Sequence, residues 1–228
     1  SRCTNDTLAP GPRIVPQIKA VARSRPIIDA WIRDERPAMK SVLVVYGTTE
    51  GQTRKIAEFI ADALRQRGVK VELVDSASEA AAQVQPVHSA AIVCGSIHRR
   101  RYQAPLLRFV KENRDWLAGL PAAFVCVSLA VLLQDGQSAE EQRKIEQAFY
   151  RQTGWTPAIT HHVAGALRHP EQDYLKRLIM RLIAKHQGGD ADTSRDREYT
   201  DWDDLTRFVD DFLAATSQQE SGHSAAER

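Results

Sequence analysis

The feature that most constrains this chain is an uncharged strand that runs directly into a hydroxyl-rich loop and then into a helix. Residues 42–46 read VLVVY, which is typical of a strand buried on both faces of a parallel sheet. The loop 47–53 reads GTTEGQT, and beyond it apolar residues recur at helical spacing as far as Gly68. Free backbone N–H groups and the positive end of the helix dipole meet in such a loop, which predicts an anion site.

The residues that this loop lacks narrow the choice of anion. It has no lysine, which a nucleoside triphosphate loop requires, and it lacks the glycine spacing of a dinucleotide fingerprint. Its threonine hydroxyls suit a phosphate monoester bound without a cation, although a loop that merely caps the helix is the alternative. The pattern T-x-E-G-x-T resembles the FMN-phosphate loop of the flavodoxins. The resemblance assigns FMN binding to Thr48, Thr49, Glu50, Gly51, Gln52 and Thr53.

The rest of the chain continues the alternation of strands and helices. Further strands are expected at 69–74, 90–94, 122–127 and 159–166, with helices at 76–84, 104–117 and 139–153 between them. Short βα connections predict a parallel sheet wrapped by helices on both faces. We therefore expect a flavodoxin-like, doubly wound α/β sheet of five parallel strands in the order 2-1-3-4-5.

This topology brings three loops to one crevice at the carboxyl edge of the sheet. In flavodoxins the isoalloxazine ring lies between the second and the third of these loops. The resemblance adds these cofactor-binding residues: Ser96, Ile97, His98, Tyr102, Ser128, Leu129 and Ala130. His98 and Tyr102 are also candidates for a catalytic role, with loop packing or flavin stacking as the alternative, and no catalytic base follows from the sequence.

Composition excludes several classes of protein and site. The 31 Lys and Arg nearly balance the 29 Asp and Glu, so bulk charge gives no indication of nucleic-acid binding. Cys94 and Cys126 lie in apolar runs and the cysteine number is odd, which favours buried thiols in a reducing compartment. No spaced Cys/His set predicts a metal, and the adjacent His161 and His162 face opposite sides of a strand. No apolar run approaches the roughly 18 residues of a membrane span.

Residues 39 to about 213 resemble a more specific family, the quinone-linked, FMN-dependent protoporphyrinogen oxidases of bacteria. The segments that carry this resemblance are 48–53, Gly95-Ser96-Ile97 with Tyr102, Ala164-Gly165-Ala166-Leu167-Arg168 with Pro170, Gly188-Gly189 with Asp192-Thr193, and Tyr199-Thr200-Asp201-Trp202. The resemblance implies oxidation of protoporphyrinogen IX to protoporphyrin IX in haem synthesis. Electrons would pass through FMN to a membrane quinone, menaquinone or ubiquinone.

The run Arg99, Arg100 and Arg101 is more basic than the family pattern. Guanidinium groups match carboxylates in bidentate geometry, so we expect these arginines to bind the propionates of the porphyrinogen. A solvated basic loop is the alternative. The same arginines disfavour an electron-carrier flavodoxin, since such carriers are usually acidic around the flavin. An NAD(P)H:quinone reductase and a flavodoxin-like domain without cofactor remain as rival hypotheses.

The two ends and one internal segment stand apart from the core domain, 39–216. Residues 1–38 hold scattered prolines and little periodicity, which predicts an irregular extension. The segment 170–199 predicts a helical insertion, whose helix 174–187 carries an aliphatic stripe and only basic charges. That helix is expected to bind the cytoplasmic face of the membrane peripherally, with packing on the sheet as the alternative. Thr200 is expected to cap the last helix, and the polar tail 217–228 is expected to be disordered.

Overall fold

The computed structural model of the chain describes residues 41–133, 135–167 and 197–226, and all structural statements below concern these residues. Five parallel strands form one sheet in the order β2-β1-β3-β4-β5, which confirms the predicted flavodoxin-like topology. The strands are β1 (Val42–Gly47), β2 (Val71–Asp75), β3 (Ala90–Ser96), β4 (Ala122–Val127) and β5 (Ile159–Val163). A separate antiparallel ribbon joins β6 (Ala166–Leu167) to β7 (Arg197–Glu198).

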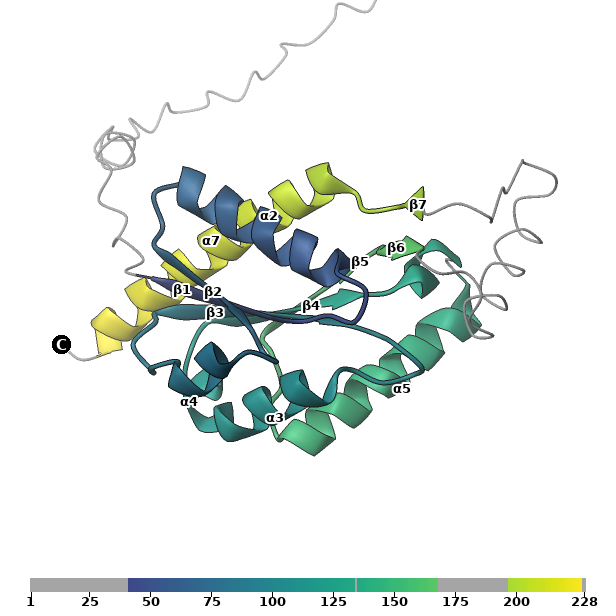
Figure 1. Cartoon of the computed structure of the whole chain (residues 1–228). Coiled ribbons are helices and arrows are strands. Elements are labelled where there is room, and N and C mark those ends of the chain that lie inside the picture. The colour runs from purple at the N-terminus through teal and green to yellow at the C-terminus, as the bar shows by residue number, and fades with distance from the viewer. Residues whose placement is uncertain (1–40, 134, 168–196, 227–228) are drawn as a thin grey trace, which may run out of the picture. The chain divides into compact units, whose positions relative to one another are not determined.

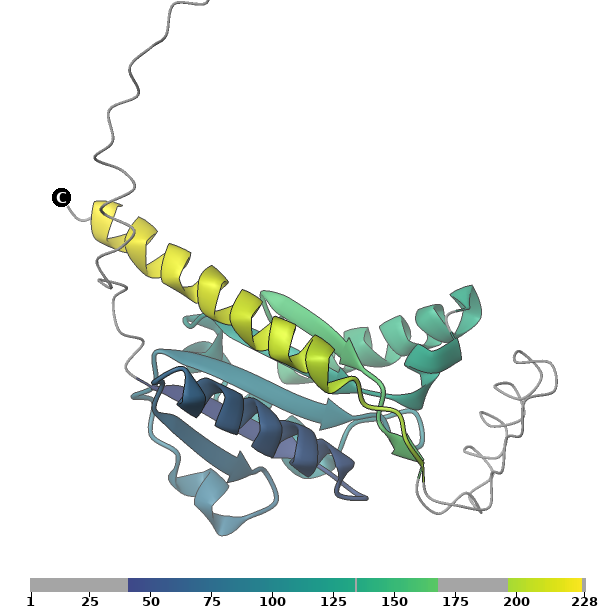
Figure 2. The ribbon, with the colours of Figure 1, turned by 90° about the horizontal axis from the view of Figure 1, so that it is seen from above.

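Helices cover both faces of the sheet (Figures 1 and 2). One face carries α2 (Gln52–Gln66) and α7 (Trp202–Ala226). The other carries α3 (Ala104–Glu112), α4 (Arg114–Ala118) and α5 (Gly136–Thr153). Two 3-10 helices, Glu79–Gln83 and Leu129–Leu133, follow β2 and β4. No described helix is both long enough and apolar enough to cross a membrane.

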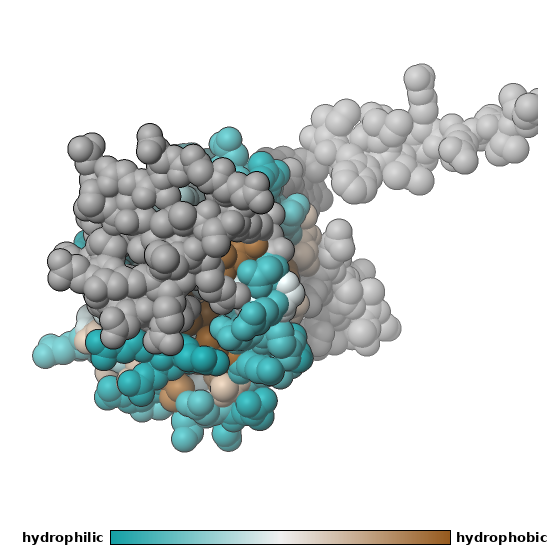
Figure 3. Space-filling model, turned by 90° about the vertical axis from the view of Figure 1, so that its right-hand side faces the viewer, coloured by the Kyte–Doolittle hydropathy of each residue, from teal (hydrophilic) through white to brown (hydrophobic). Residues whose placement is uncertain are grey.

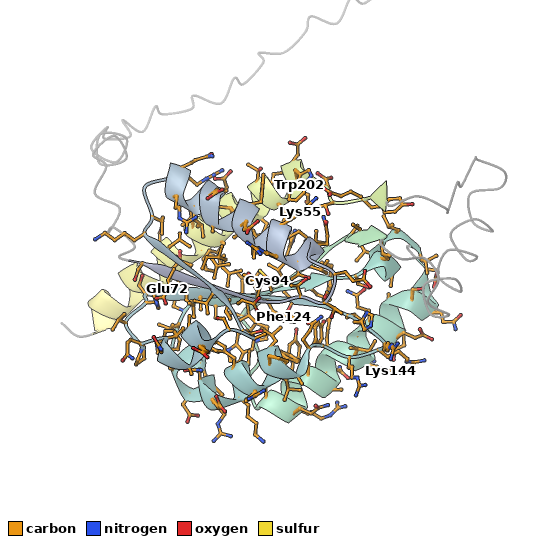
Figure 4. All side chains as sticks on the ribbon, viewed as in Figure 1. Lys55, Glu72, Cys94, Phe124, Lys144 and Trp202 are labelled. Atoms are coloured by element: carbon orange, nitrogen blue, oxygen red, sulfur yellow. The ribbon has the colours of Figure 1, made fainter. Side chains whose placement is uncertain are left out.

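The core is divided by the sheet because successive strand residues point to opposite faces. Every residue of β1 and β4 is buried, as expected for strands covered on both sides. Cys94 belongs to the cluster beneath α2 and α7, whereas Phe124 belongs to the cluster beneath α3 and α5 (Figure 4). Phe124 packs there against Tyr102, Phe149 and Trp155.

The expected third helix is interrupted at Asn113. The Asn113 side chain donates to the carbonyl oxygen of Phe109 at 2.9 Å, and helix α4 begins at the next residue. Such local bonding lets asparagine compete with continued helix. Two other expectations also need correction: the expected helix at 76–84 is a 3-10 helix, and the fifth strand ends at Val163 before the chain turns into the β6–β7 ribbon.

The final helix differs from the expectation at both ends. Asp201, and not Thr200, supplies the cap, because the Asp201 Oδ1 accepts from the Asp204 N–H at 2.9 Å. Helix α7 continues to Ala226, into the tail 217–228 that the sequence predicts to be disordered. No proline lies between Asp201 and Ala226 to end the helix.

Several predictions concern residues outside the described ranges. These are the irregular extension 1–38, the helix 174–187 and most of the insertion 170–199. Within that insertion the structure describes the residues of β7 and Tyr199.

Candidate functional site

The loops after β1, β3 and β4 enclose one crevice at the carboxyl edge of the sheet, as the topology predicted (Figure 3 faces this edge). Thirteen residues line it: Thr48, Thr49, Glu50, Gln52, Thr53, Ser96, Ile97, His98, Val127, Ser128, Leu129, Gly165 and Ala166. Hydroxyl and amide groups come mainly from the first loop, and the aliphatic side chains come from the second and third. The crevice is therefore polar toward α2 and apolar toward β4.

The first loop turns sharply into α2 at Gly51. Gly51 has φ 86°, a left-handed conformation that glycine adopts without steric cost, and its N–H donates to the Thr48 Oγ1 at 2.9 Å. As the N-cap of α2 it offers no side-chain acceptor to the first-turn N–H groups. Thr53 is 1 % exposed and lines the crevice beside them. Uncapped helix N–H groups with adjacent hydroxyls fit a phosphate group.

Two glutamine side chains hold the loops in place, a role that no sequence pattern indicates. The Gln103 Nε2 donates to the Thr49 Oγ1 at 3.1 Å and to the Ser96 Oγ at 2.8 Å, which joins the first loop to the second. The Gln52 Nε2 donates to the Thr200 Oγ1 at 2.9 Å, which joins the first loop to the segment before α7. Among the described residues the buried Gln52 Oε1 has no hydrogen-bond partner. This acceptor fits a ligand that carries hydroxyl groups next to its phosphate.

Ten of the residues predicted to bind the cofactor line the crevice, and three do not. Gly51 forms the turn of the first loop but does not line the crevice. Ala130 does not line it either, and its N–H donates to the Ser128 Oγ at 3.1 Å. Tyr102 does not line the crevice either, because it lies in the core beneath α3 and α5. Its side chain is only 5 % exposed, and its hydroxyl lies 2.9 Å from the Cys126 Sγ. Burial raises the pKa of Tyr102 well above its ordinary value.

The place of Tyr102 follows from the glycine at the end of β3. A Cβ on Gly95 would lie 2.9 Å from the Tyr102 Cδ1 and 2.8 Å from the Leu106 Cδ2. The tyrosine ring therefore packs directly over the Gly95 backbone and against Phe124 and Phe149. Tyr102 is thus a core residue that does not line the crevice, and its role at the flavin stays a prediction.

Three lining residues are absent from the sequence prediction: Val127, Gly165 and Ala166. Val127 is the last residue of the buried strand β4, where nothing in the apolar sequence distinguishes it from its neighbours. Gly165 lies close to it, since a Cβ on Gly165 would lie 3.0 Å from the Val127 Cγ1. The segment 164–168 carries part of the family resemblance. Because the sequence predicts a strand over 159–166, it does not indicate that Gly165 and Ala166 line the crevice.

The charged groups at the crevice come from the first and second loops. The His98 Nδ1 lies 3.9 Å from the Glu50 Oε1, so the two loops meet through this pair. Beyond His98 the chain makes a two-residue hairpin, in which the backbones of His98 and Arg101 exchange hydrogen bonds of 2.9 and 3.2 Å. Arg99 and Arg100 occupy the turn with φ of 49° and 65°, and both are exposed. None of the three arginines forms an ion pair with another described residue.

Comparison with known proteins agrees with this geometry. The flavodoxin domain family matches residues 43–194. The protoporphyrinogen IX dehydrogenase (quinone) of Leishmania major is 30 % identical over 176 residues, which cover 75 % of this chain and 74 % of that protein. The chain belongs to the flavodoxin-domain family of these dehydrogenases. FMN is accordingly its cofactor, and the hydroxyl-lined phosphate loop fits that group.

Two further similar proteins lie at lower identity. The Escherichia coli K12 enzyme of the same name is 27 % identical over 176 residues, covering 77 % of this chain and 96 % of that protein. Among solved structures, a short-chain flavodoxin associated with a non-canonical PDU bacterial microcompartment is 18 % identical, with a TM-score of 0.42. The match covers 64 % of this chain and 99 % of that one.

Proposed function

We propose that this protein oxidises protoporphyrinogen IX to protoporphyrin IX in haem synthesis and passes the electrons to a membrane quinone, menaquinone or ubiquinone. The observation that carries the proposal is the match to a dehydrogenase of that name over 176 residues, 75 % of this chain. The crevice supports it, because a polar phosphate side and an apolar ring side stand next to a cationic hairpin.

The phosphate side of the crevice binds and orients the cofactor. The Thr48 and Thr53 hydroxyls and the first-turn N–H groups of α2 would hold the FMN phosphate. Gln103 keeps Thr49 and Ser96 at a fixed separation, so the first two loops cannot drift apart around the ring. Preorganised contacts of this kind reduce the entropy that binding must overcome.

The ring side supplies an apolar surface and one group that can carry a proton. Bound FMN supplies the two-electron redox chemistry. Ile97, Val127 and Leu129 exclude water from the crevice wall. Oxidation of the macrocycle also releases protons, and His98 is our candidate to accept them. The imidazole lines the crevice, and its Nδ1 lies 3.9 Å from the Glu50 Oε1.

The hairpin of Arg99, Arg100 and Arg101 is our candidate for binding the substrate propionates. A two-residue hairpin turn with positive φ favours Asn-Gly, whereas arginine at each left-handed position costs roughly 1–2 kcal/mol. Strained positions of this kind are concentrated at functional sites, which supports a role for the two side chains beyond shaping the turn. Three exposed guanidinium groups beside the flavin crevice fit a dicarboxylate substrate.

Two variants test the hairpin. Both should raise the KM for the substrate, but only the second should also raise the melting temperature. Replacing all three arginines by glutamine should raise the KM for protoporphyrinogen by about tenfold, the loss of one charged contact of ~1.4 kcal/mol, with flavin content intact. The pair Arg99→Asn and Arg100→Gly should raise the melting temperature, because it relieves the turn, and should still raise KM. An unchanged KM in both variants would show that the hairpin is only a solvated loop.

We also propose that the protein binds the cytoplasmic face of the membrane peripherally, where its quinone resides. The support is the sequence of residues 174–187, which carries Lys176, Arg177, Arg181 and Lys185 beside leucines and no acidic residue. Each basic residue near an anionic surface contributes roughly 1 kcal/mol of attraction, which salt screens.

Sedimentation with anionic liposomes tests this proposal. The protein should pellet with the vesicles at low salt and remain in the supernatant at high salt. Leu178→Ser with Leu182→Ser should weaken binding while the melting temperature is retained. Failure of the unaltered protein to pellet at low salt would contradict membrane binding, and loss of fold in the double variant would indicate that the stripe packs inside the protein.

Anaerobic flavin reduction separates the proposed activity from its rivals. Mixing the FMN-loaded protein with protoporphyrinogen IX should bleach the oxidised flavin absorbance, while NADPH should leave it unchanged. Reduction by NADPH alone would instead identify an NAD(P)H:quinone reductase. Reduction by neither compound would favour an electron carrier.

A further inference from the structure

A second group of polar side chains lies away from the crevice, between the sheet and α5. Cys126 of β4 and His162 of β5 are register partners in the parallel sheet, so their side chains point to the same face. Helix α5, which covers this face of the sheet, adds Gln142 and Glu146, one helical turn apart. One donor atom each from Cys126, Glu146 and His162 lies within 4.8 Å of the other two.

Hydrogen bonds connect this cluster, which we call the Cys126 cluster, into one unit. The His162 Nε2 lies 2.7 Å from the Glu146 Oε1, and the Gln142 Nε2 donates to the same oxygen at 3.1 Å. Gln142 also lies 3.6 Å from the Cys126 Sγ, and the Tyr102 hydroxyl lies 2.9 Å from it on the other side. Burial raises the pKa of Glu146, but the contacts with His162 and Gln142 outweigh this effect and hold the pKa below its ordinary value.

The burial of the cluster is graded from the core to the surface. Cys126 is fully buried and the Glu146 side chain is 9 % exposed, whereas the His162 side chain is 43 % exposed. Since β5 is an edge strand of the sheet, His162 stands where a small ion could enter from solvent. The thiol and the carboxylate lie behind it, in a position that water reaches poorly.

We propose that Cys126, Glu146 and His162 bind a zinc-type divalent cation at a site separate from the flavin crevice. Sulfur, imidazole nitrogen and carboxylate oxygen are the donors that Zn²⁺ takes from proteins, at about 2.0–2.3 Å from the metal. Tetrahedral ligands at those lengths stand about 3.3–3.8 Å apart. The three donor atoms already lie within 4.8 Å, so small side-chain movements bring them to that spacing.

The neighbouring side chains complete the coordination. Rotation of the Gln142 amide exchanges its nitrogen for its oxygen, which places a fourth donor beside the thiol and the carboxylate. The Tyr102 hydroxyl then donates to the metal-bound sulfur and orients it. Binding releases the proton of the Cys126 thiol, as metal binding to thiols generally requires. A closed set of protein donors of this kind defines a structural site that joins β4, β5 and α5.

Cobalt titration of the full FMN-loaded chain, dialysed against a chelator, tests the site. Co²⁺ in a tetrahedral thiolate site absorbs at wavelengths longer than those of oxidised flavin, so the signal is separable. We expect saturation at one equivalent, displacement by Zn²⁺, and a higher melting temperature with either ion. Absence of this visible band, or no change in melting temperature, would show that the Cys126 cluster is only a hydrogen-bonded network.

Three variants assign the ligands. Cys126→Ser and His162→Gln should each weaken Co²⁺ binding at least tenfold. The fold should tolerate His162→Gln, because that side chain is 43 % exposed. Cys94→Ser is the matched control, because Cys94 is equally buried but lies on the opposite face of the sheet. Equal binding by His162→Gln and the unaltered protein would overturn the proposal, as would loss of binding in Cys94→Ser with its fold retained.

Discussion

Replacing Thr48 and Thr53 together by alanine is expected to release FMN from the protein on desalting. Both side chains line the crevice beside the uncapped start of α2. A hydrogen bond to a charged group is worth about 1.5–3 kcal/mol, so the pair contributes about 3–6 kcal/mol to phosphate binding. The dissociation constant of FMN should therefore rise by roughly two to four orders of magnitude. Titration of the apoprotein with FMN, followed by flavin fluorescence quenching, measures it.

Thr206→Ala is the matched control for this experiment. The Thr206 hydroxyl donates to the Trp202 carbonyl oxygen within α7 at 2.9 Å and takes no part in the crevice. This variant should retain flavin like the unaltered protein. Undiminished flavin occupancy in the double variant would mean that the first loop does not hold the phosphate.

Phe124→Ala is expected to cause a large loss of stability, because it removes the centre of the aromatic cluster under α3 and α5. The side chain is fully buried, stacks on Phe149 at a centroid distance of 5.2 Å and makes T-shaped contacts with Tyr102 and Trp155. Removing a buried phenyl ring costs about 3–5 kcal/mol, because transfer and cavity effects add. Domains of this kind have only about 5–15 kcal/mol of stability, so the midpoint of chemical denaturation should shift markedly.

Phe59→Ala provides the comparison for this result. Phe59 is half-buried and meets Trp202 at a centroid distance of 4.9 Å, so its removal opens the protein to water and leaves no closed cavity. Its loss of unfolding free energy should be clearly smaller. Equal losses for the two variants would contradict the view that full burial in the aromatic cluster makes Phe124 the larger contributor to stability.

The strand order and the first loop could be predicted from sequence because local and long-range signals agree there. The uncharged run 42–46 requires cover on both faces, and short βα connections then leave few topologies. Tyr102 could not be placed, because its burial depends on Gly95, which lets the ring approach the backbone of β3. The role of Gln103 could not be predicted, because its contacts, Thr49 and Ser96, lie in two different loops.

The Cys126 cluster shows a more general limit of sequence reading. Its donors lie on β4, α5 and β5, and no short spacing relates residues 126, 146 and 162. Only the register of β4 with β5 places Cys126 opposite His162. The sequence does not show where α7 ends. The polar composition after Ser217 indicates solvent exposure, but it does not indicate the absence of a helix.

The most direct test of the proposed function is the stoichiometry of the complete reaction. FMN-loaded protein is mixed anaerobically with protoporphyrinogen IX and a soluble quinone analogue. Porphyrin fluorescence and quinol formation are then followed together. Because six electrons leave the macrocycle and each quinone accepts two, three quinols should form for each protoporphyrin. The Thr48→Ala, Thr53→Ala double variant should form neither product above the rate without protein. Porphyrin formation that is independent of the protein, or of the quinone, would contradict the proposed function.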